Sequence, residues 1–378
     1  MKLRTYERRH NKEMGKSIIG IRQFTILVIL FTVGSSILIT PSGLAAEAKQ
    51  NAWIAAILSV CIGLLTVFLY QALVRQFPNQ TLVQMCETLF GIWIGKIVSL
   101  LYFCFFFLLA ALVLRNIGDF VVTQVLPDTP LQFILMIFLA VVIMASRQGI
   151  ETIARTGEIF FPWVMIFFFA MVLFLAPQFR LIQLKPYLGE GIIPVIRASF
   201  PFTGTPFMEL IVLLMVIPFV NCVKKANKAF FVGTLIAGIL LIMITLISIL
   251  VLGAGITARN LYPSYSLAKM ISVGKFLERL EVLMAGIWFI TIFFKLTICF
   301  YASVLSFAQV IKMEEIRPLC FPFGMILIVL SIVTYPNESY FLNFVSKIWF
   351  PYAFTFGLLL PICMIGLSLF RKGEKYNG

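Results

Sequence analysis

The sequence has little charge and is nearly devoid of histidine and aspartate. Charged residues make up 12% of the 378 residues, His10 is the only histidine, and Asp119 and Asp128 are the only aspartates. Most intramembrane hydrolases need a histidine beside a serine, paired aspartates, or histidine ligands for a metal. The composition therefore excludes most of these enzymes, and we expect neither a catalytic site nor a metal or other cofactor.

The sequence also lacks a cysteine framework. Its seven cysteines are scattered, mostly within apolar runs, and have no paired spacing. Small apolar side chains of this kind pack well inside membranes, whereas disulfide and zinc frameworks need regular spacings. We interpret the cysteines as packing residues.

Apolar residues dominate the rest of the composition. Hydrophobic residues account for 61% of the chain, and the mean hydropathy is +1.02. No water-soluble domain can bury so much apolar surface, so the composition predicts a polytopic membrane protein. The net charge of +14 does not indicate a nucleic-acid partner, because the basic residues lie in short segments between apolar runs.

The apolar runs predict ten membrane spans in a single all-α domain, residues 24–370. The expected spans are about 24–46, 52–75, 97–126, 131–146, 156–176, 196–220, 228–254, 279–310, 318–335 and 347–370. Segments on the side of the N terminus hold roughly twice as many Lys and Arg as those on the other side, which predicts cytoplasmic termini. Residues 1–23 are then a basic cytoplasmic tail that anchors the chain, and residues 371–378 a second cytoplasmic tail.

Spans one and six are interrupted by small polar residues and prolines. Span one contains "GSSILITPSGL" (34–44), and span six contains "PFTGTPFMEL" (201–210). A proline lacks an N–H group and clashes with the carbonyl four residues earlier, so Pro41 and Pro206 each leave a carbonyl without its helical partner. Such breaks survive in a bilayer only where they are buried in protein or line a cavity. Breaks in the first and sixth of ten spans predict a 5+5 inverted repeat, about 24–176 and 196–370, with a binding site near the midplane.

The residues at the two breaks are the candidate ligand-binding residues. Thr205 is expected to cap the second half of span six and Pro206 to begin it, so that free N–H groups at a positive helix end face the ligand. The alternative is that the hydroxyl groups only satisfy the loosened helices. Together with Trp288, which either walls the pocket or packs in the bundle, the candidates are Gly34, Ser35, Ser36, Phe202, Thr203, Gly204, Thr205 and Glu209.

Six further segments carry a family resemblance. In chain order they read "ITPSGLAAEAKQNAWIAAILS" (39–59), "FPNQTL" (77–82), "LPDTP" (126–130), "GIETIARTGEIFFP" (149–162), "LKPYLGEGI" (184–192) and "FLERLEVLMAGIWF" (276–289). Together with the two breaks they resemble the spore germination permease family, the membrane-embedded B subunits of nutrient germinant receptors. That family is a branch of the amino acid–polyamine–organocation transporters.

The resemblance implies a leucine-transporter-like fold and residence in the inner spore membrane. It also implies assembly with an A-type subunit and a C-type lipoprotein, and a small nutrient ligand such as an amino acid, a sugar or a nucleoside. The chain departs from the family at Gly34-Ser35, where a Gly-Thr pair is common, and at residues 203–206, where a glycine-rich turn is usual. Both departures keep small polar residues.

Lys295 is the most unusual charge in the sequence. The segment "WFITIFFKLTICF" (288–300) places it near the centre of span eight, too far from either end to reach the membrane surface easily. In leucine-transporter-like folds span eight packs against span one, where sodium-coupled members hold an ion. We hypothesise that the Lys295 ammonium takes the place of that cation and contacts the freed carbonyls of span one. A structural ion pair within the bundle is the alternative.

Other charges have simpler interpretations. Arg115 can pair with Asp119, and Glu151 with Arg155, because each pair is four residues apart on a predicted helix. Glu158 is a candidate proton carrier, as are Glu209 and Lys295. Three further charges at the external mouth of span eight are candidate gating residues, namely Glu278, Arg279 and Glu281.

The sequence therefore predicts a nutrient germinant receptor subunit that binds its ligand in the membrane and signals through partner subunits. One alternative is a proton-coupled transporter of amino acids or amines. Another is a structural or conduit subunit with no ligand of its own.

Overall fold

The computed structural model describes residues 19–189, 191–271, 281–337, 340–341 and 344–374, which are almost entirely helical. The longer α-helices are α2 (Ile21–Val33), α3 (Ser36–Ala48), α4 (Ala52–Gln76), α5 (Leu82–Phe120), α6 (Leu131–Gln148), α7 (Ile150–Leu175), α8 (Ile193–Gly204), α9 (Val223–Leu252), α12 (Glu281–Val310), α13 (Arg317–Val333) and α16 (Leu360–Glu374). Shorter α-helices are α10 (Ala254–Arg259), α11 (Pro263–Lys269) and α15 (Phe350–Phe354). The 3-10 segments are η1 (Lys49–Asn51), η3 (Ala176–Gln178), η4 (Leu181–Leu184), η5 (Met208–Met215) and η6 (Ile217–Phe219), and the π-helical segments are η2 (Val121–Val125), η7 (Val345–Trp349) and η8 (Thr355–Leu359).

The helices match the membrane spans that the sequence predicts. Within the described residues, eight helical runs are long and apolar enough to cross a membrane, and two shorter apolar helices are α2 and α13. One of the eight runs, Ser36–Gln76, joins the second half of predicted span one to span two. The all-helical membrane fold is therefore confirmed.

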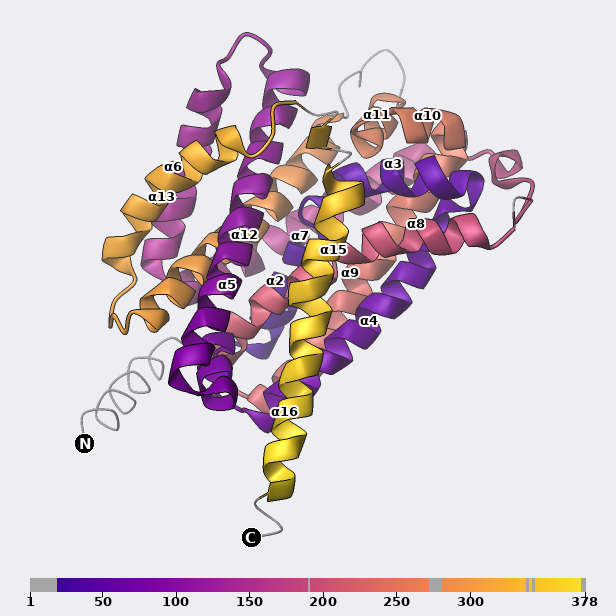
Figure 1. Ribbon diagram of the computed structural model, residues 1–378. Coiled ribbons are helices and arrows are strands. Elements are labelled where there is room, and N and C mark those ends of the chain that lie inside the picture. Colours follow the sequence, from indigo (N-terminus) through magenta and orange to yellow (C-terminus); the bar gives the residue numbers. More distant parts are fainter. Residues whose placement is uncertain (1–18, 190, 272–280, 338–339, 342–343, 375–378) are drawn as a thin grey trace.

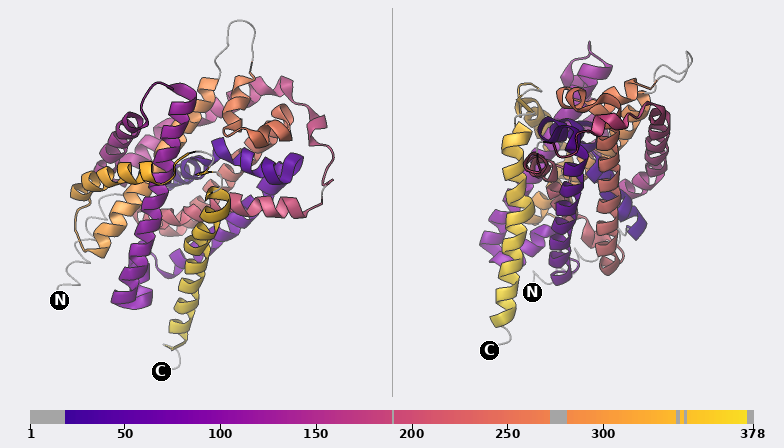
Figure 2. Two further views of the ribbon diagram at one scale, coloured as in Figure 1. Left: turned by 45° about the horizontal axis from the view of Figure 1, so that its top comes forward. Right: turned by 90° about the vertical axis from the view of Figure 1, so that its right-hand side faces the viewer.

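The long helices form one bundle with a crowded centre (Figures 1 and 2). α3, α10 and α11 gather at the upper end in Figure 1, while α4, α5 and α16 descend to the lower end. α6 and α13 pack together on one flank. The broken spans are interior elements: every residue of η5 is buried, and so are nine of the thirteen in α2.

The break in span one lies at Gly34 and Ser35, between α2 and α3. Gly34 leaves helical geometry, with φ 14° and ψ −118°. Pro41 lies inside α3 rather than in the break, which corrects the expectation that it interrupts span one. The carbonyl of Ile37, four residues before Pro41, accepts a 2.6 Å hydrogen bond from Ser264 Oγ of α11. A neighbouring hydroxyl thus satisfies the carbonyl that the proline frees, and the helix continues.

The break in span six lies at Thr205–Phe207, between α8 and η5. The expectation that Thr205 caps the second half and Pro206 begins it is wrong, because η5 starts at Met208 and its N-cap residue, Phe207, makes no side-chain cap. Packing gives the reason: the buried Phe207 ring occupies the place where a side chain at Gly63 of α4 would lie. The restart of the helix is fixed by this contact across the bundle rather than by a local cap.

The second half of span six is a 3-10 helix of unusual length. η5 covers eight residues, whereas 3-10 runs longer than three or four residues are uncommon because their hydrogen bonds are poorly aligned. Backbone hydrogen bonds also tie this half to the start of span one: Ile19 N donates to Phe219 O at 2.9 Å, and Asn221 N donates to Ile19 O at 3.1 Å. The two broken spans are therefore linked near the lower end of the bundle.

The connection between spans two and three leads into α5. Thr81 is the N-cap residue of this helix and forms a capping box, because its hydroxyl accepts from Gln84 N and its own N–H donates to the Gln84 side chain. The chain then bends at Gly91, whose φ of 81° suits glycine. The long α5 continues from there into the bundle.

Candidate functional site

The Lys295 side chain reaches from α12 to the break in span one. Its ammonium Nζ donates to Ser35 Oγ at 3.0 Å and lies 5.5 Å from the centre of the Phe31 ring. The side chain is fully buried. Gly34 makes room for it, because a Cβ at that position would lie 2.6 Å from Lys295 Cδ. The ammonium contacts span one through the Ser35 hydroxyl and not through the freed carbonyl that the hypothesis named.

Glu209 is the second partner of Lys295. Its Oε2 lies 2.6 Å from Lys295 Nζ, its Oε1 accepts a 2.9 Å hydrogen bond from Trp349 Nε1, and its side chain is 1% exposed. One ion pair therefore joins spans six and eight, with Ser35 of span one and Trp349 of span ten as further partners.

The two charges lie at helix ends of opposite sign. Glu209 is in the first turn of η5, where the backbone N–H groups favour an anion. Lys295 lies beside the last residues of α2, where the backbone carbonyls favour a cation. Each broken helix thus lowers the energy of the charge at its own break, which offsets part of the large desolvation cost of burying an ion pair.

Trp349 is a site residue that the sequence reasoning missed. It ends the π-helical segment η7 in span ten, and its ring stacks on Phe105 of α5 with centroids 5.7 Å apart. A buried indole N–H needs an acceptor, and the Glu209 carboxylate supplies it. No local pattern in the sequence pairs Trp349 with Glu209, 140 residues earlier.

Tyr70 of α4 supports the backbone at the break in span six. Its hydroxyl lies 2.6 Å from Gly357 O in η8 and 3.1 Å from Met208 O in η5. Gly357 allows this close approach of spans six and ten, because a Cβ there would lie 2.7 Å from Met208 O. A tyrosine from span two thus holds together carbonyls of two irregular helices.

Replacing Tyr70 with phenylalanine is expected to destabilise the protein by about 1–3 kcal/mol, because the two buried carbonyls that share its single O–H lose that donor. Thermal unfolding of the purified protein in detergent measures the change. Tyr187→Phe is the control, since Tyr187 is 57% exposed, and it should shift stability by less than about 0.5 kcal/mol. Equal effects of the two substitutions would contradict a role for Tyr70 at the break.

Comparison with known proteins assigns the chain to a family. A family model described as "Spore germination protein" matches residues 18–339. The chain belongs to the spore germination protein family. It is 33% identical over 367 residues to spore germination protein KB of Bacillus subtilis (strain 168). The aligned region covers 96% of this chain and 97% of the relative. It is 28% identical over 371 residues to spore germination protein YndE of the same organism, which covers 95% of this chain and 99% of that protein.

Solved structures show the fold of this spore germination protein. The transporter MhsT, in complex with L-phenylalanine, superimposes with a TM-score of 0.64 at 12% identity, covering 92% of this chain and 97% of MhsT. Mhp1, a nucleobase-cation-symport-1 family transporter in a closed conformation with bromovinylhydantoin bound, gives a TM-score of 0.61 at 14% identity, covering 90% of this chain and 79% of Mhp1. The predicted leucine-transporter-like fold is confirmed.

Two buried polar groups near the break in span one have no partner among the described residues of this spore germination protein, namely Ser36 Oγ and Trp288 Nε1. Ser36 is the first residue of α3. Trp288 lies one turn before Thr291, whose hydroxyl is 3.4 Å from Gly34 O but bonds more closely to Ile287 O, at 2.9 Å. A buried polar group without a partner is costly, so each is a place where a ligand atom would be stabilised.

The remaining candidates in span six make contacts within the bundle. Thr203 donates a 2.8 Å hydrogen bond to Ser199 O of its own helix, and the Phe202 ring packs on Phe207 with centroids 5.9 Å apart. Gly204 lies against Phe350, so a Cβ there would be 3.0 Å from the Phe350 ring. Thr205 lies in the turn that breaks the span. These four residues determine the shape of the break in span six, and Glu209 is the charged residue beside it.

Two other charged candidates, Glu158 and Glu281, lie away from the Lys295–Glu209 pair. Glu158 of α7 accepts a 3.0 Å hydrogen bond from Gln23 Nε2 and lies 3.4 Å from Arg22 Nε, at the opposite end of α2 from Gly34. Glu281 begins α12, and Glu278 and Arg279 fall outside the described residues.

The two predicted local ion pairs are confirmed. Arg115 Nε lies 2.8 Å from Asp119 Oδ1, and Arg155 Nη2 lies 2.5 Å from Glu151 Oε1. Tyr335 also donates to Asp119 Oδ2, at 2.7 Å. Both pairs are explained by their i, i+4 spacing on one helix.

Proposed function

We propose that this spore germination protein is the nutrient-binding membrane subunit of a germinant receptor. It binds a small nutrient, such as an amino acid, a sugar or a nucleoside, between the breaks in spans one and six. It lies in the inner spore membrane with both termini in the cytoplasm, in one domain from about residue 24 to residue 370, and acts through an A-type subunit and a C-type lipoprotein. The buried Lys295–Glu209 pair at the two breaks is the observation that carries this proposal.

The chemistry at the breaks suits a small polar ligand. Lys295 offers an ammonium, Glu209 a carboxylate, and Ser36 and Trp288 two polar groups without partners among the described residues. A ligand carboxylate or hydroxyl can approach Lys295, and a ligand ammonium can approach Glu209. Both charges are held in place by Ser35 and Trp349, so the site is preorganised before the ligand arrives.

In the proposed mechanism the ligand shifts the packing of the broken helices. Lys295 and Glu209 hold η5 and α12 together while no nutrient is bound. A ligand that takes over part of the pairing favours a second packing, in which η5 and α12 are less tightly joined. The ligand can shift the equilibrium only by its difference in affinity for the two packings. The movement of spans six and eight then reaches the partner subunits.

Vesicles that contain the purified protein distinguish the proposal from its rivals. We expect labelled nutrient to bind saturably and not to accumulate inside the vesicles when a pH gradient is imposed. In the proposed mechanism the Lys295–Glu209 pair changes the packing of the helices and does not carry a proton across the membrane. Protein-free vesicles provide the background. Accumulation driven by the gradient would instead indicate a proton-coupled transporter using Glu158, Glu209 or Lys295. An absence of binding across the nutrients to which the spores respond would indicate a structural subunit.

A further inference from the structure

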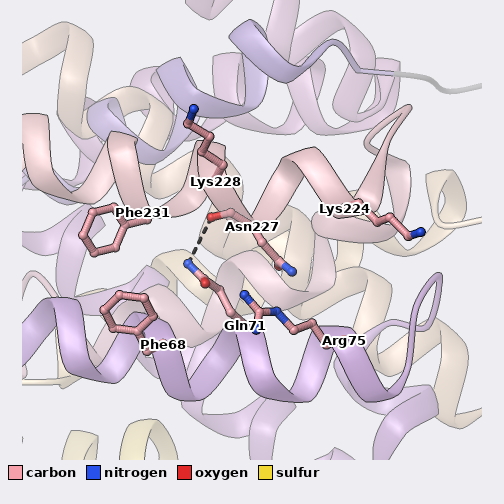
Figure 3. Close-up of a pocket in the computed structure, with 7 residues that line it drawn as sticks. All are labelled: Phe68, Gln71, Arg75, Lys224, Asn227, Lys228 and Phe231. Carbon is pink, nitrogen blue, oxygen red and sulfur yellow. Dashed lines mark hydrogen bonds between the residues drawn. The ribbon is translucent and has the colours of Figure 1, made fainter.

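A groove separates the lower ends of α4 and α9. Figure 3 shows the seven residues that line it. Phe68, Gln71 and Arg75 come from α4, and Lys224, Asn227, Lys228 and Phe231 come from α9. The groove has a volume of about 570 Å³, which is large enough for the headgroup and first carbons of a lipid.

The mouth of the groove carries concentrated positive charge. Arg75, Lys224 and Lys228 are exposed and, among the residues that the structure describes, none of them forms an ion pair with an acidic side chain. A smaller hollow of about 370 Å³ lies beside it, lined in part by Lys225 and Lys228. The cationic surface therefore continues from α4 across the start of α9 toward α2.

The floor of the groove holds a buried amide. Asn227 is 8% exposed, and its Oδ1 has no hydrogen-bond partner in the described part of the chain. In Figure 3 the nitrogen end of the Asn227 side-chain amide points toward the Arg75 guanidinium. Gln71 is 4% exposed and fixes the floor by donating from Nε2 to Asn227 O at 3.0 Å. A buried polar group of this kind needs a partner, and the groove is where one can enter.

The inner end of the groove is aromatic. The rings of Phe68 and Phe231 have centroids 5.1 Å apart, and Phe68 is 50% exposed. Phe68 lies seven residues before Arg75 on α4, about two helical turns further from the end of that helix. Along one groove, cations and amides at the end of the helices give way to exposed aromatic rings in the apolar region.

We propose that this groove binds an anionic phospholipid. The phosphate and headgroup lie between Arg75, Lys224 and Lys228, the Asn227 amide contacts the polar glycerol region, and an acyl chain lies on the two phenylalanine rings. Basic pockets between membrane helices on the cytoplasmic side recognise lipids in this way. Soluble phosphate or an acidic peptide would use the cations but would have no need of accessible aromatic rings at membrane depth, so the combination favours a lipid.

The groove is connected to the break in span six through α4. Gln71 directly follows Tyr70, whose hydroxyl holds the carbonyls of Met208 and Gly357. α9 in turn packs along α2, which ends at the break in span one. A lipid that joins α4 to α9 would therefore stabilise the packing of both broken spans.

The test measures how much phosphatidylglycerol stays bound to the full chain after purification from vesicles of phosphatidylglycerol and phosphatidylcholine. Arg75→Gln/Lys228→Gln is expected to lower the affinity for phosphatidylglycerol roughly thirtyfold, because each removed charge weakens anionic lipid binding by roughly five- to sixfold. Lys96→Gln/Lys312→Gln removes equal charge elsewhere and should leave the affinity unchanged. The charge-preserving variant Arg75→Lys/Lys228→Arg should also bind, which separates lost charge from lost folding.

Three results would overturn the proposal. Equal losses in the groove variant and in the Lys96→Gln/Lys312→Gln variant would show that diffuse surface charge retains the lipid. Displacement of the lipid by inorganic phosphate at similar concentration would show a site for the free anion. Tighter binding of an oligoglutamate peptide than of phosphatidylglycerol, lost in the same groove variant, would show a docking site for an acidic protein segment.

Discussion

Lys295→Met is expected to destabilise the protein by about 3–5 kcal/mol, because it leaves the Glu209 carboxylate buried and without its cation. Glu209 is 1% exposed, so water cannot replace the lost partner unless the packing opens. Glu209→Gln should cost a similar amount, since it leaves the Lys295 ammonium unpaired. Thermal or denaturant unfolding of the purified protein in detergent measures both changes.

The double variant Lys295→Met/Glu209→Gln tests whether the two charges interact directly. Removing both charges leaves no uncompensated ion, so we expect it to recover most of the stability that either single variant loses. Arg155→Met is the matched control: Arg155 pairs with Glu151, but its side chain is 69% exposed, and the loss should stay below about 1 kcal/mol. Additive effects in the double variant would contradict a direct ion pair.

Function is expected to follow a different pattern from stability. The double variant should fold but fail to respond to nutrient, because the charges that meet the ligand are gone. Spore germination in response to nutrient, with receptor abundance measured alongside, reports this. If Lys295→Met left ligand affinity, receptor assembly and germination unchanged, Lys295 would have no role in the response.

Gly34→Ala is expected to reduce the nutrient response at least fivefold. Its Cβ would lie 2.6 Å from Lys295 Cδ and 2.7 Å from Phe31 O, so the lysine must move away from Ser35 and Glu209. Overpacking of this kind costs about 1–3 kcal/mol, which corresponds to roughly a 5- to 150-fold change. The nutrient concentration that gives half-maximal germination measures the effect.

Gly43 offers a matched control for that substitution. It lies in α3, the other half of the same broken span, and a Cβ there would meet nothing within 4 Å. Gly43→Ala should therefore leave the response unchanged and slightly stabilise the helix. If Gly34→Ala behaved like Gly43→Ala, the close packing of Lys295 on the break would not matter for the response.

The sequence predicts the breaks well because their cause is local. Glycine, serine and proline inside an apolar run weaken a helix wherever it lies, and the interruptions at Gly34 and Thr205 follow from that composition. Pro41 shows the limit of local reasoning. It looks like part of the break, yet a single hydrogen bond from Ser264, in a distant helix, lets α3 continue through it.

The details of the site depend on contacts between distant spans. Glu209 and Lys295 stand out in the sequence as isolated charges in apolar runs, but their pairing requires span six to restart at Met208. That restart depends on the space that Gly63 leaves for Phe207. Nothing in the sequence marks Trp349 or Tyr70 as a site residue, because an aromatic residue in a membrane span usually serves only to pack against its neighbours. Their polar partners are seen only in the folded bundle.

Exchange of the break segments tests the central claim most directly. Residues 34–36 and 203–209 would be replaced together with those of a relative that responds to a different nutrient, and germination of spores carrying the chimera would be measured with both nutrients. If the nutrient binds between the two breaks, the response should follow the exchanged segments. A chimera that is present at normal abundance and keeps its original nutrient preference would contradict a binding site at the breaks.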